Sequence, residues 1–247
     1  MHSIPSNKRH PNLTMARRTS EDLRMQLASL ACCTMEVSVP TAHLGLPSDL
    51  FPITLYCDEE LVCRQPGESE ALEVVVSTVR SGPGSFQTEG TGGLAIAMLT
   101  PLGMLSLLRA PMHGLADRRV PLEHFCGRSE QRKLRSAVMS AKTNQERIEV
   151  FGRWLEAHIL DSRPLTSYET RIAGAAMTLL HTPDMRIDLD EIARANAITR
   201  RQLERDFRKW LGVSPASYVR LVRFQRAARA LAAGKPIVEY TWGKIWN

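Results

Sequence analysis

The chain has 247 residues, with 32 lysines and arginines against 26 aspartates and glutamates, a formal net charge of +6. Hydrophobic residues make up 43% of it, which is enough for a folded core and excludes a fully disordered chain. No uninterrupted apolar run approaches the length of a membrane span, so no membrane partner is expected. The length fits two domains or one large one.

The first 34 residues are predicted to be a disordered leader. Residues 1–18 are polar and basic and contain no apolar stretch, so they do not form a secretory signal. A basic arm that touches DNA stays open as an alternative for the same residues. With no export signal, the chain is expected in a cytoplasm.

The cysteines are odd in number and none forms a Cys-x-x-Cys pair; they are Cys32, Cys33, Cys57, Cys63 and Cys126. No His pair with metal-ligand spacing lies near them, so no metal and no cofactor are predicted. Reduced, buried thiols are the favoured interpretation, and a thiol that senses redox state or a ligand stays open as the alternative.

Residues 35–99 have the pattern of a small β-sheet, sandwich or barrel, cupin-like in type. Short apolar or alternating runs are separated by turn residues, and Gly82-Pro83-Gly84 is interpreted as a hairpin turn. The predicted strands are Val37–Val39 before Pro40, Ile53–Tyr56, Leu61–Cys63, Leu72–Val79 and Leu94–Leu99.

After Pro101 the pattern becomes helical. The first predicted helices are Leu102–Arg109, a short helix with Pro121 in its first turn that ends near Gly127, and Ser129–Ala141. A capping box of Thr143 and Glu146 opens a fourth helix. On one face of that helix lie Ile148, Phe151, Leu155 and Ile159. These helices form either a dimer surface or a lid on the sheet. Residues 35–163 are therefore predicted to be a β-rich regulatory or dimerisation domain in an α+β protein, with a linker over residues 161–167.

Residues 164–247 are predicted to be an all-α DNA-binding domain. Between Arg186 and Lys235 there are twelve basic residues against five acidic ones, a local charge of +7, whereas the full chain carries +6. Positive charge concentrated on helices is typical of a protein that binds nucleic acid.

A helix-turn-helix is predicted within this region. An apolar-faced helix, Glu169–His181, precedes two short helices joined by a four-residue turn. The two helices are Leu189–Ala195, capped by Asp188 with Glu191, and Arg200–Leu211, capped by Thr199 with Gln202 and stopped by Gly212. Leu203, Phe207, Trp210 and Leu211 are expected on the inner side of the second helix.

The opposite face of the second helix carries a charged stripe of Arg201, Glu204, Arg205 and Arg208. Arginine can bind guanine O6 and N7 bidentately, and glutamate can accept a hydrogen bond from cytosine N4. Arg200 and Lys209 flank the stripe and suit phosphates. A solvated charged helix face is the alternative, which the two capped helices and the turn between them disfavour.

The next helix is predicted to open with Ser214-Pro215, to bury a stripe from Tyr218 to Leu231, and to end at Gly234. Its arginines recur every three residues, at positions 220, 223, 226 and 229. They are expected to meet a nucleic-acid backbone as point charges, so that losing one weakens binding without changing sequence preference.

These residues resemble the AraC/XylS family of bacterial transcription regulators. The resemblance rests on Leu189-x-x-Ile192-Ala193, on the run from Thr199 to Pro215 with its Leu-x-Arg-x-Phe and Gly-x-Ser-Pro motifs, and on Tyr218, Arg220 and Arg223–Ala227. A less specific resemblance covers residues 90–160, with Pro101-Leu102-Gly103 and Leu122-Glu123. The AraC/XylS resemblance implies two helix-turn-helix units joined by one long helix, with Arg201, Glu204 and Arg205 facing bases. The residues predicted to contact phosphates are Arg200, Arg208, Lys209, Arg220 and Arg223.

Two positions depart from the family pattern. Ala197 stands where the family has glycine, and a left-handed alanine costs on the order of 1 kcal/mol. After Glu239 the chain reads Tyr240–Asn247 and ends, so the second helix-turn-helix is predicted to be incomplete. A lone unit makes fewer phosphate contacts, which lowers its affinity and leaves it strongly sensitive to salt.

The leading hypothesis is a sequence-specific, ligand-responsive regulator that binds double-stranded DNA. Its further partners are a small-molecule effector, a second copy in a homodimer, and RNA polymerase if it activates. The alternative is a truncated interaction protein that dimerises with a full-length regulator without binding DNA. An enzyme built on His43, His113, His124 and Cys126 is disfavoured, because no nucleophile, zinc or phosphate-loop motif is present.

Overall fold

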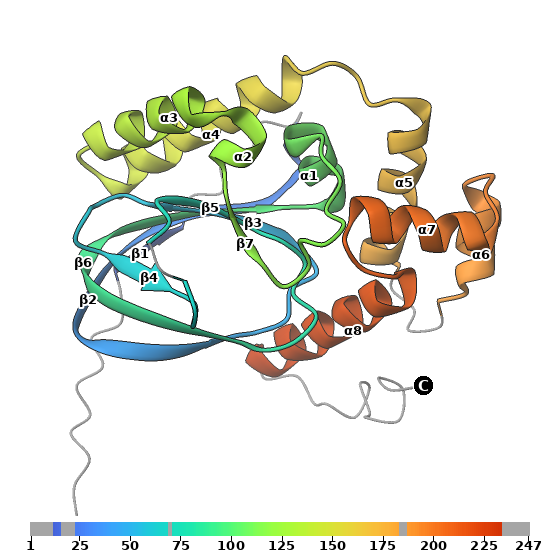
Figure 1. Ribbon diagram of the computed structural model, residues 1–247, viewed down its shortest axis with the longest axis horizontal. Coiled ribbons are helices and arrows are strands. Elements are labelled where there is room, and N and C mark those ends of the chain that lie inside the picture. Colours follow the sequence, from blue (N-terminus) through green and yellow to red (C-terminus); the bar gives the residue numbers. More distant parts are fainter. Residues whose placement is uncertain (1–11, 16–22, 69–70, 183–186, 234–247) are drawn as a thin grey trace, which may run out of the picture.

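The computed structural model describes residues 12–15, 23–68, 71–182 and 187–233 (Figure 1). Its strands form one antiparallel sheet in the order β1-β2-β6-β3-β5-β7, with β4 paired to the distal half of β6. The strands are β1 (Asn12–Met15), β2 (Leu27–Gly45), β3 (Phe51–Tyr56), β4 (Val62–Arg64), β5 (Val74–Ser77), β6 (Gly84–Leu99) and β7 (Arg119–Pro121). The predicted α+β class is confirmed.

The predicted leader is wrong for the residues of it that the structure describes, because β1 and the start of β2 lie within it. Leu27 and Leu30 are each 3% exposed, and Leu30 packs on Gly152 of the helical layer. Burial of these side chains outweighs the polar residues between them. The predicted boundary at residue 35 therefore falls inside β2.

β2 and β6 are the longest strands of the sheet and pair with each other along most of their length. They pair from Leu27↔Leu99 to Gly45↔Gly84, with a register shift between Val37 and Thr41. Pro40 lies in that shift, where a bulge removes the need for its missing amide hydrogen. The prediction that a strand ends before Pro40 is therefore wrong. The Gly82–Gly84 turn is also no hairpin, since β5 pairs with β3 and β7 rather than with β6.

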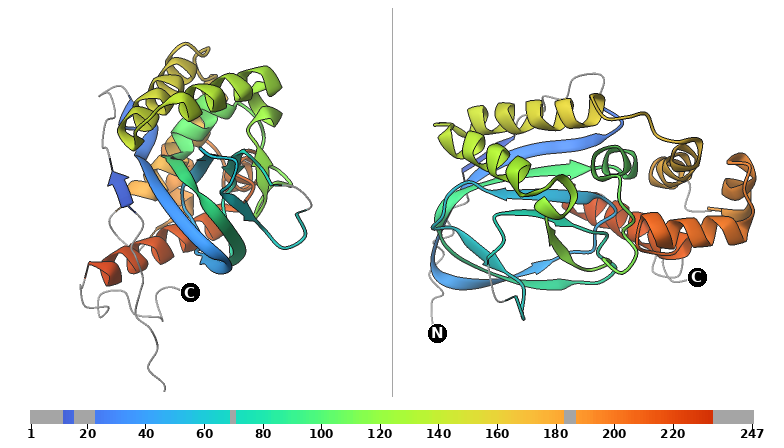
Figure 2. Two further views of the ribbon diagram at one scale, coloured as in Figure 1. Left: turned by 90° about the vertical axis from the view of Figure 1, so that its left-hand side faces the viewer. Right: turned by 45° about the horizontal axis from the view of Figure 1, so that its top comes forward.

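Helices cover one face of the sheet, with α3 and α4 side by side (Figures 1 and 2). This layer comprises α1 (Pro101–Leu108), α2 (Glu123–Cys126), α3 (Arg128–Ser140) and α4 (Asn144–Leu160). The predicted inner face of α4, from Ile148 to Ile159, is buried, and Thr143 caps the helix. Pro121 ends β7 instead of opening a helix, because its neighbours pair with β5.

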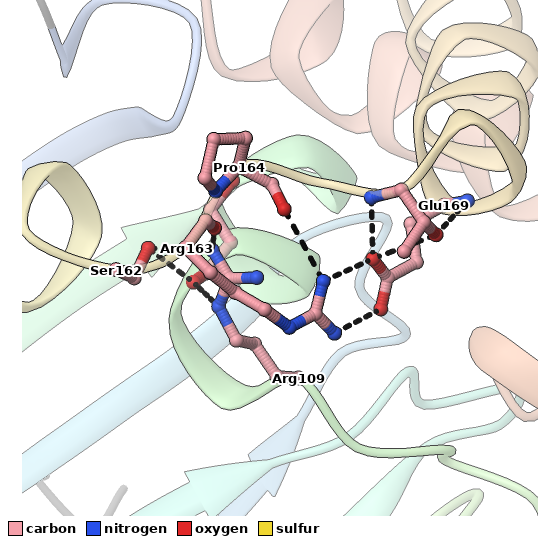
Figure 3. Close-up of polar contacts among 7 residues, drawn as sticks. Arg109, Ser162, Arg163, Pro164 and Glu169 are labelled. Carbon is pink, nitrogen blue, oxygen red and sulfur yellow. Dashed lines mark hydrogen bonds and ion pairs between the residues drawn. The ribbon is translucent and has the colours of Figure 1, made fainter.

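The predicted linker is held in place by two arginines (Figure 3). Arg109, the left-handed C-cap of α1, donates to Ser162 Oγ at 2.6 Å and to the carbonyl of Arg163. Arg163 in turn binds both oxygens of Glu169, each at 3.0 Å. Glu169 also closes the capping box of α5 (Ser167–His181) with Thr166, a cap that the sequence analysis missed. The linker therefore fixes where α5 begins.

Glu169 makes the stability of this junction depend on pH. Its hydrogen bonds from Arg163 lower the pKa of the carboxyl to about 2. Because the folded state binds this proton less readily than the unfolded chain, the stabilisation is present above the ordinary glutamate pKa and is lost as pH falls toward 2. We expect Glu169→Gln to lower the free energy of unfolding by about 2 kcal/mol at pH 7.

Urea unfolding of Glu169→Gln and of the parent chain from pH 7 to pH 3 measures this difference. The difference in free energy of unfolding between the variant and the parent should decrease continuously as the pH is lowered. Glu60→Gln, a change at an exposed loop carboxylate, serves as the control and should track the parent. A difference in free energy of unfolding that stays constant with pH would contradict the lowered pKa of Glu169.

Candidate nucleic-acid interface

The helix-turn-helix consists of α6 (Leu189–Ala195) and α7 (Arg200–Trp210), followed by α8 (Pro215–Ala232). Asp188 caps α6 by accepting from the amides of Asp190 and Glu191, and Thr199 caps α7 by accepting from the amide of Gln202. These caps satisfy amides that have no partner inside a helix. The predicted helices and the capping side chains of Asp188 and Thr199 are confirmed, whereas the hydrogen bonds of the described residues include no return bond from Glu191 or Gln202.

The turn between α6 and α7 contains a left-handed alanine, Ala197, with a φ of 53°. Its amide donates to the carbonyl of Arg194, and the amide of Ile198 donates to that of Ala193, both at 3.0 Å. These bonds hold the turn against a backbone strain of about 1 kcal/mol. The turn therefore keeps its tight geometry without a glycine.

The inner side of α7 is packed as predicted. Leu203, Phe207 and Leu211 are fully buried, and the Phe207 ring meets Tyr218 of α8 edge-on at 6.0 Å. Edge-to-face pairs add stability beyond the area they bury. This packing fixes which face of α7 points outward.

A buried carboxylate on α7, Asp206, was missed by the sequence analysis. It is 1% exposed and accepts from the Tyr168 hydroxyl of α5 and from Gln202 Nε2 at 2.9 Å. Gln202 therefore spans one turn of α7 and does not close the predicted capping box. The available signal was spacing, since Asp206 follows Leu203 by three residues and so shares its inner face. Asp206 joins α7 to α5 by a polar contact inside the core.

The outer face of α7 carries the predicted base-reading residues. Arg201 is exposed, and the Arg205 side chain is 68% exposed while its Nε lies 3.4 Å from Asp206. Glu204 lies between Arg200 and Arg208, each with a nitrogen 3.4 Å from its carboxylate. The structure therefore brings these side chains together on one face and places Glu204 inside an ion-pair network.

This face lines a cleft of about 950 Å³ whose other wall comes from the α1–β7 loop. The cleft is lined by Pro111, His113, Thr199, Arg201, Gln202, Glu204, Arg205, Arg208 and Lys209. The His113 amide donates to the Lys209 carbonyl at 3.0 Å, at the end of α7. Lys209 also lies over the Trp210 ring at 5.1 Å. The sheet domain thus contributes a wall to the surface that α7 presents.

Helix α8 is attached to the sheet domain through Asp49, which is 1% exposed. Tyr218 donates to the Asp49 carbonyl at 2.8 Å, and Arg229 lies 3.1 Å from its carboxylate. Burial raises the pKa of Asp49, and the charge of Arg229 opposes that effect. Arg226 donates to the Leu180 carbonyl at 2.8 Å. Arg226 and Arg229, two of the four α8 arginines predicted to face a nucleic-acid backbone, therefore each make a contact within the protein, although the Arg229 side chain stays 56% exposed.

The other residues predicted on α8 have mixed outcomes. Arg220 is exposed and donates to Ser217 Oγ at 3.0 Å, whereas Arg223 is half-buried. Leu231 was expected in the buried stripe but is 51% exposed. Gly234, the predicted helix end, and Tyr240–Asn247, the predicted incomplete second unit, lie outside the described residues.

Other chemistry is sparse in the described part of the chain. No group of three or more histidine, cysteine or acidic side chains there is placed to hold a metal ion. None of its helices is long and apolar enough to cross a bilayer. All five cysteines are unbridged, with Cys32, Cys33 and Cys57 buried.

Comparisons with known proteins address the class of this domain. Residues 192–243 match a family model described as a helix-turn-helix domain. Solved structures with similarity include apo ToxT from Vibrio cholerae (11% identity, TM-score 0.45, covering 87% of this chain and 88% of that one). Others are unsaturated fatty acid bound wild-type ToxT from Vibrio cholerae (9%, 0.45, 93% and 88%) and the AraC-like transcriptional activator CuxR (14%, 0.33, 94% and 90%). A search of curated proteins found no match.

The paired helices and the domain match define a DNA-binding protein of the helix-turn-helix class. The match confirms the helix-turn-helix predicted for this part of the chain.

Phe207 is expected to be the main apolar anchor of α7. Phe207→Ala should lower the free energy of unfolding by about 3–5 kcal/mol, because a fully buried ring is replaced by a cavity. Urea unfolding followed by circular dichroism measures the loss. Arg208→Ala, an exposed change on the same helix, should alter stability by less than about 1 kcal/mol. Equal stabilities for the two variants would show that the ring is not part of the core.

Proposed function

We propose that the chain is a sequence-specific transcription regulator that reads the DNA major groove with α7. The observation that carries the proposal is the outward exposure of Arg201 and Arg205 on the second helix of a helix-turn-helix. In such motifs the N-terminal residues of the second helix contact base edges. Residues up to 163 are then the regulatory or dimerisation part, and residues from 164 are the DNA-binding part.

The roles of the basic residues follow from their positions on α7 and α8. Arg201 and Arg205 are proposed to bind guanines, and Glu204 to accept from a cytosine amine after leaving one of its two arginine partners. Arg200, Arg208 and Lys209 on α7, with the α8 residues Arg220 and Arg223, are proposed to bind phosphates, which position the helix without reading sequence.

Ligand response is proposed to act through the junction between the sheet domain and the DNA-binding helices. The α1–β7 loop holds the end of α7, and Asp49 holds α8. A ligand that favours one arrangement of the sheet domain over another would shift the population of DNA-competent molecules. As a bacterial regulator the protein would act in the cytoplasm on double-stranded DNA, as a homodimer where its sites are paired, and on RNA polymerase if it activates.

A fluorescence anisotropy titration against the upstream DNA of its own gene tests the proposal. Arg201→Ala and Arg205→Ala should each weaken binding to that duplex by about 1–3 kcal/mol and leave binding to a shuffled duplex nearly unchanged. Arg220→Ala should weaken binding to both. Arg153→Ala, an exposed change on α4, is the matched control and should affect neither.

The same titration at two salt concentrations distinguishes sequence-specific binding from non-specific electrostatic binding. Preference for the upstream duplex that persists at the higher salt supports a working regulator. Equal affinities for both duplexes, abolished by salt, would contradict sequence reading and favour the interaction protein that dimerises with a longer relative.

A further inference from the structure

The sheet domain contains a buried arginine, Arg80, that follows β5. Its side chain lies across Gly84 and against the Phe86 ring, with Cζ 4.6 Å from the ring centroid. The residue is 8% exposed. A Cβ at Gly84 would lie 1.4 Å from Arg80 Nη1, so only glycine leaves room for the guanidinium there.

Within the described residues, no hydrogen bond or ion pair reaches the Arg80 guanidinium. The carboxylate of Asp117 is nearby, but its oxygens accept from the Ser81 amide and hydroxyl, each at 2.6 Å. Burial lowers the pKa of Arg80 despite the charge of Asp117. A buried cation without a hydrogen-bonded counter-ion is costly in a folded protein.

A neighbouring buried arginine, Arg119, has the hydrogen-bond partners that are typical of a structural role. Arg119 is 9% exposed and lies 5.8 Å from the same Phe86 ring. It binds the Glu68 carboxylate at 2.7 Å, the Cys63 carbonyl at 3.1 Å and the Tyr56 hydroxyl at 3.2 Å. Arg119 thus has a carboxylate, a carbonyl and a hydroxyl as partners, whereas the donors of Arg80 have no such partners among the described residues.

The Arg80 side chain lines a cleft of about 410 Å³ at the edge of the sheet. The cleft is further lined by Gln65, Pro66, Ser81, Gly82, Pro83, Gly84, Ser85 and Asp117. A Cβ at Gly82 would meet nothing within 4 Å, so the backbone is open there, and Gln65 and Ser85 supply polar side chains. A volume of this size lies within the range of small-molecule sites.

We propose that this cleft is a binding site for a small molecule bearing an oxyanion, a carboxylate or phosphate group, held by the Arg80 guanidinium. The planar fork of arginine matches both groups with two parallel hydrogen bonds. Asp117 borders the cleft with a negative charge, so a singly charged carboxylate should bind more tightly than a doubly charged phosphate.

The site lies at one end of a rigid connection to α7. Asp117 donates its amide to the Val79 carbonyl, and Thr78 Oγ1 donates to the carbonyls of Leu115 and Arg118. The other end of that loop holds α7 through His113. As an effector site this cleft rests on the function proposed above, whereas binding of the oxyanion does not.

An amide chemical-shift titration of the full chain tests the site. The probes are sodium propionate and inorganic phosphate, each added against sodium chloride of equal ionic strength. We expect saturable shifts around residues 81–85, with propionate tighter. Arg80→Gln should weaken binding at least about tenfold, because a charge-assisted pair is lost.

Two further variants keep the test decisive. Arg80→Lys preserves the charge and loses the fork, so it should bind with intermediate affinity, and it decides the question if Arg80→Gln does not fold. Arg64→Gln, which removes a half-exposed arginine on β4, should bind like the parent. Absence of saturable shifts with both probes, or equal affinity in all three variants, would overturn the site.

Failure of the site and failure of the regulator are distinguishable. Oxyanion binding through Arg80 without sequence preference for DNA would leave the site intact and contradict the regulator. Sequence-specific DNA binding without oxyanion binding would support the regulator and contradict the site. If both hold, saturating propionate should change the affinity for the upstream duplex in the parent and leave it unchanged in Arg80→Gln.

Discussion

The close approach of the α1–β7 loop to the end of α7 determines how the DNA-binding helices sit on the sheet domain. Gly212 has a φ of 79°, and a Cβ there would lie 2.8 Å from the Met112 carbonyl oxygen. Glycine therefore satisfies two demands at once, since it ends α7 in the left-handed region and lets another backbone pass against it. Met112 is fully buried at this contact. The direction in which α7 points is thus set from outside the helix-turn-helix.

The interior supports the same view, because one hydrophobic cluster runs from the sheet through α1 and α5 to α8. Domains that fold independently each have their own hydrophobic core, and the interface between them is more polar than an obligate interface. Here Asp49 adds a buried polar contact to the apolar one, with Tyr218 and Arg229 on the same residue. Separating α8 from the sheet would leave that carboxylate without its cation, which is costly unless water replaces it. The helices therefore move against the sheet only together with a rearrangement of these contacts.

Features that local chemistry decides could be predicted from the sequence. The caps Asp188 and Thr199, the left-handed Ala197 and the Gly212 stop each depend on residues within one turn of helix. Features that depend on distant segments could not be predicted in this way. The burial of Leu27, the β7 pairing of Pro121 and the capture of Arg229 by Asp49 depend on elements far apart in the chain. Spacing alone does not reveal which strand or carboxylate will lie opposite.

The arginines of α8 show the consequence for function. Charge counted along the sequence treats positions 220, 223, 226 and 229 as equivalent, but Arg226 and Arg229 each also donate within the protein, to the Leu180 carbonyl and to the Asp49 carboxylate. Only cations that neutralise phosphates release counter-ions, so the salt dependence of DNA binding reflects the exposed ones. The same reasoning applies to Arg80, whose burial removes it from the surface charge and directs its donors into a cleft. A basic composition thus divides into residues that hold the helices on the sheet and residues that remain for a ligand, and only the fold separates the two.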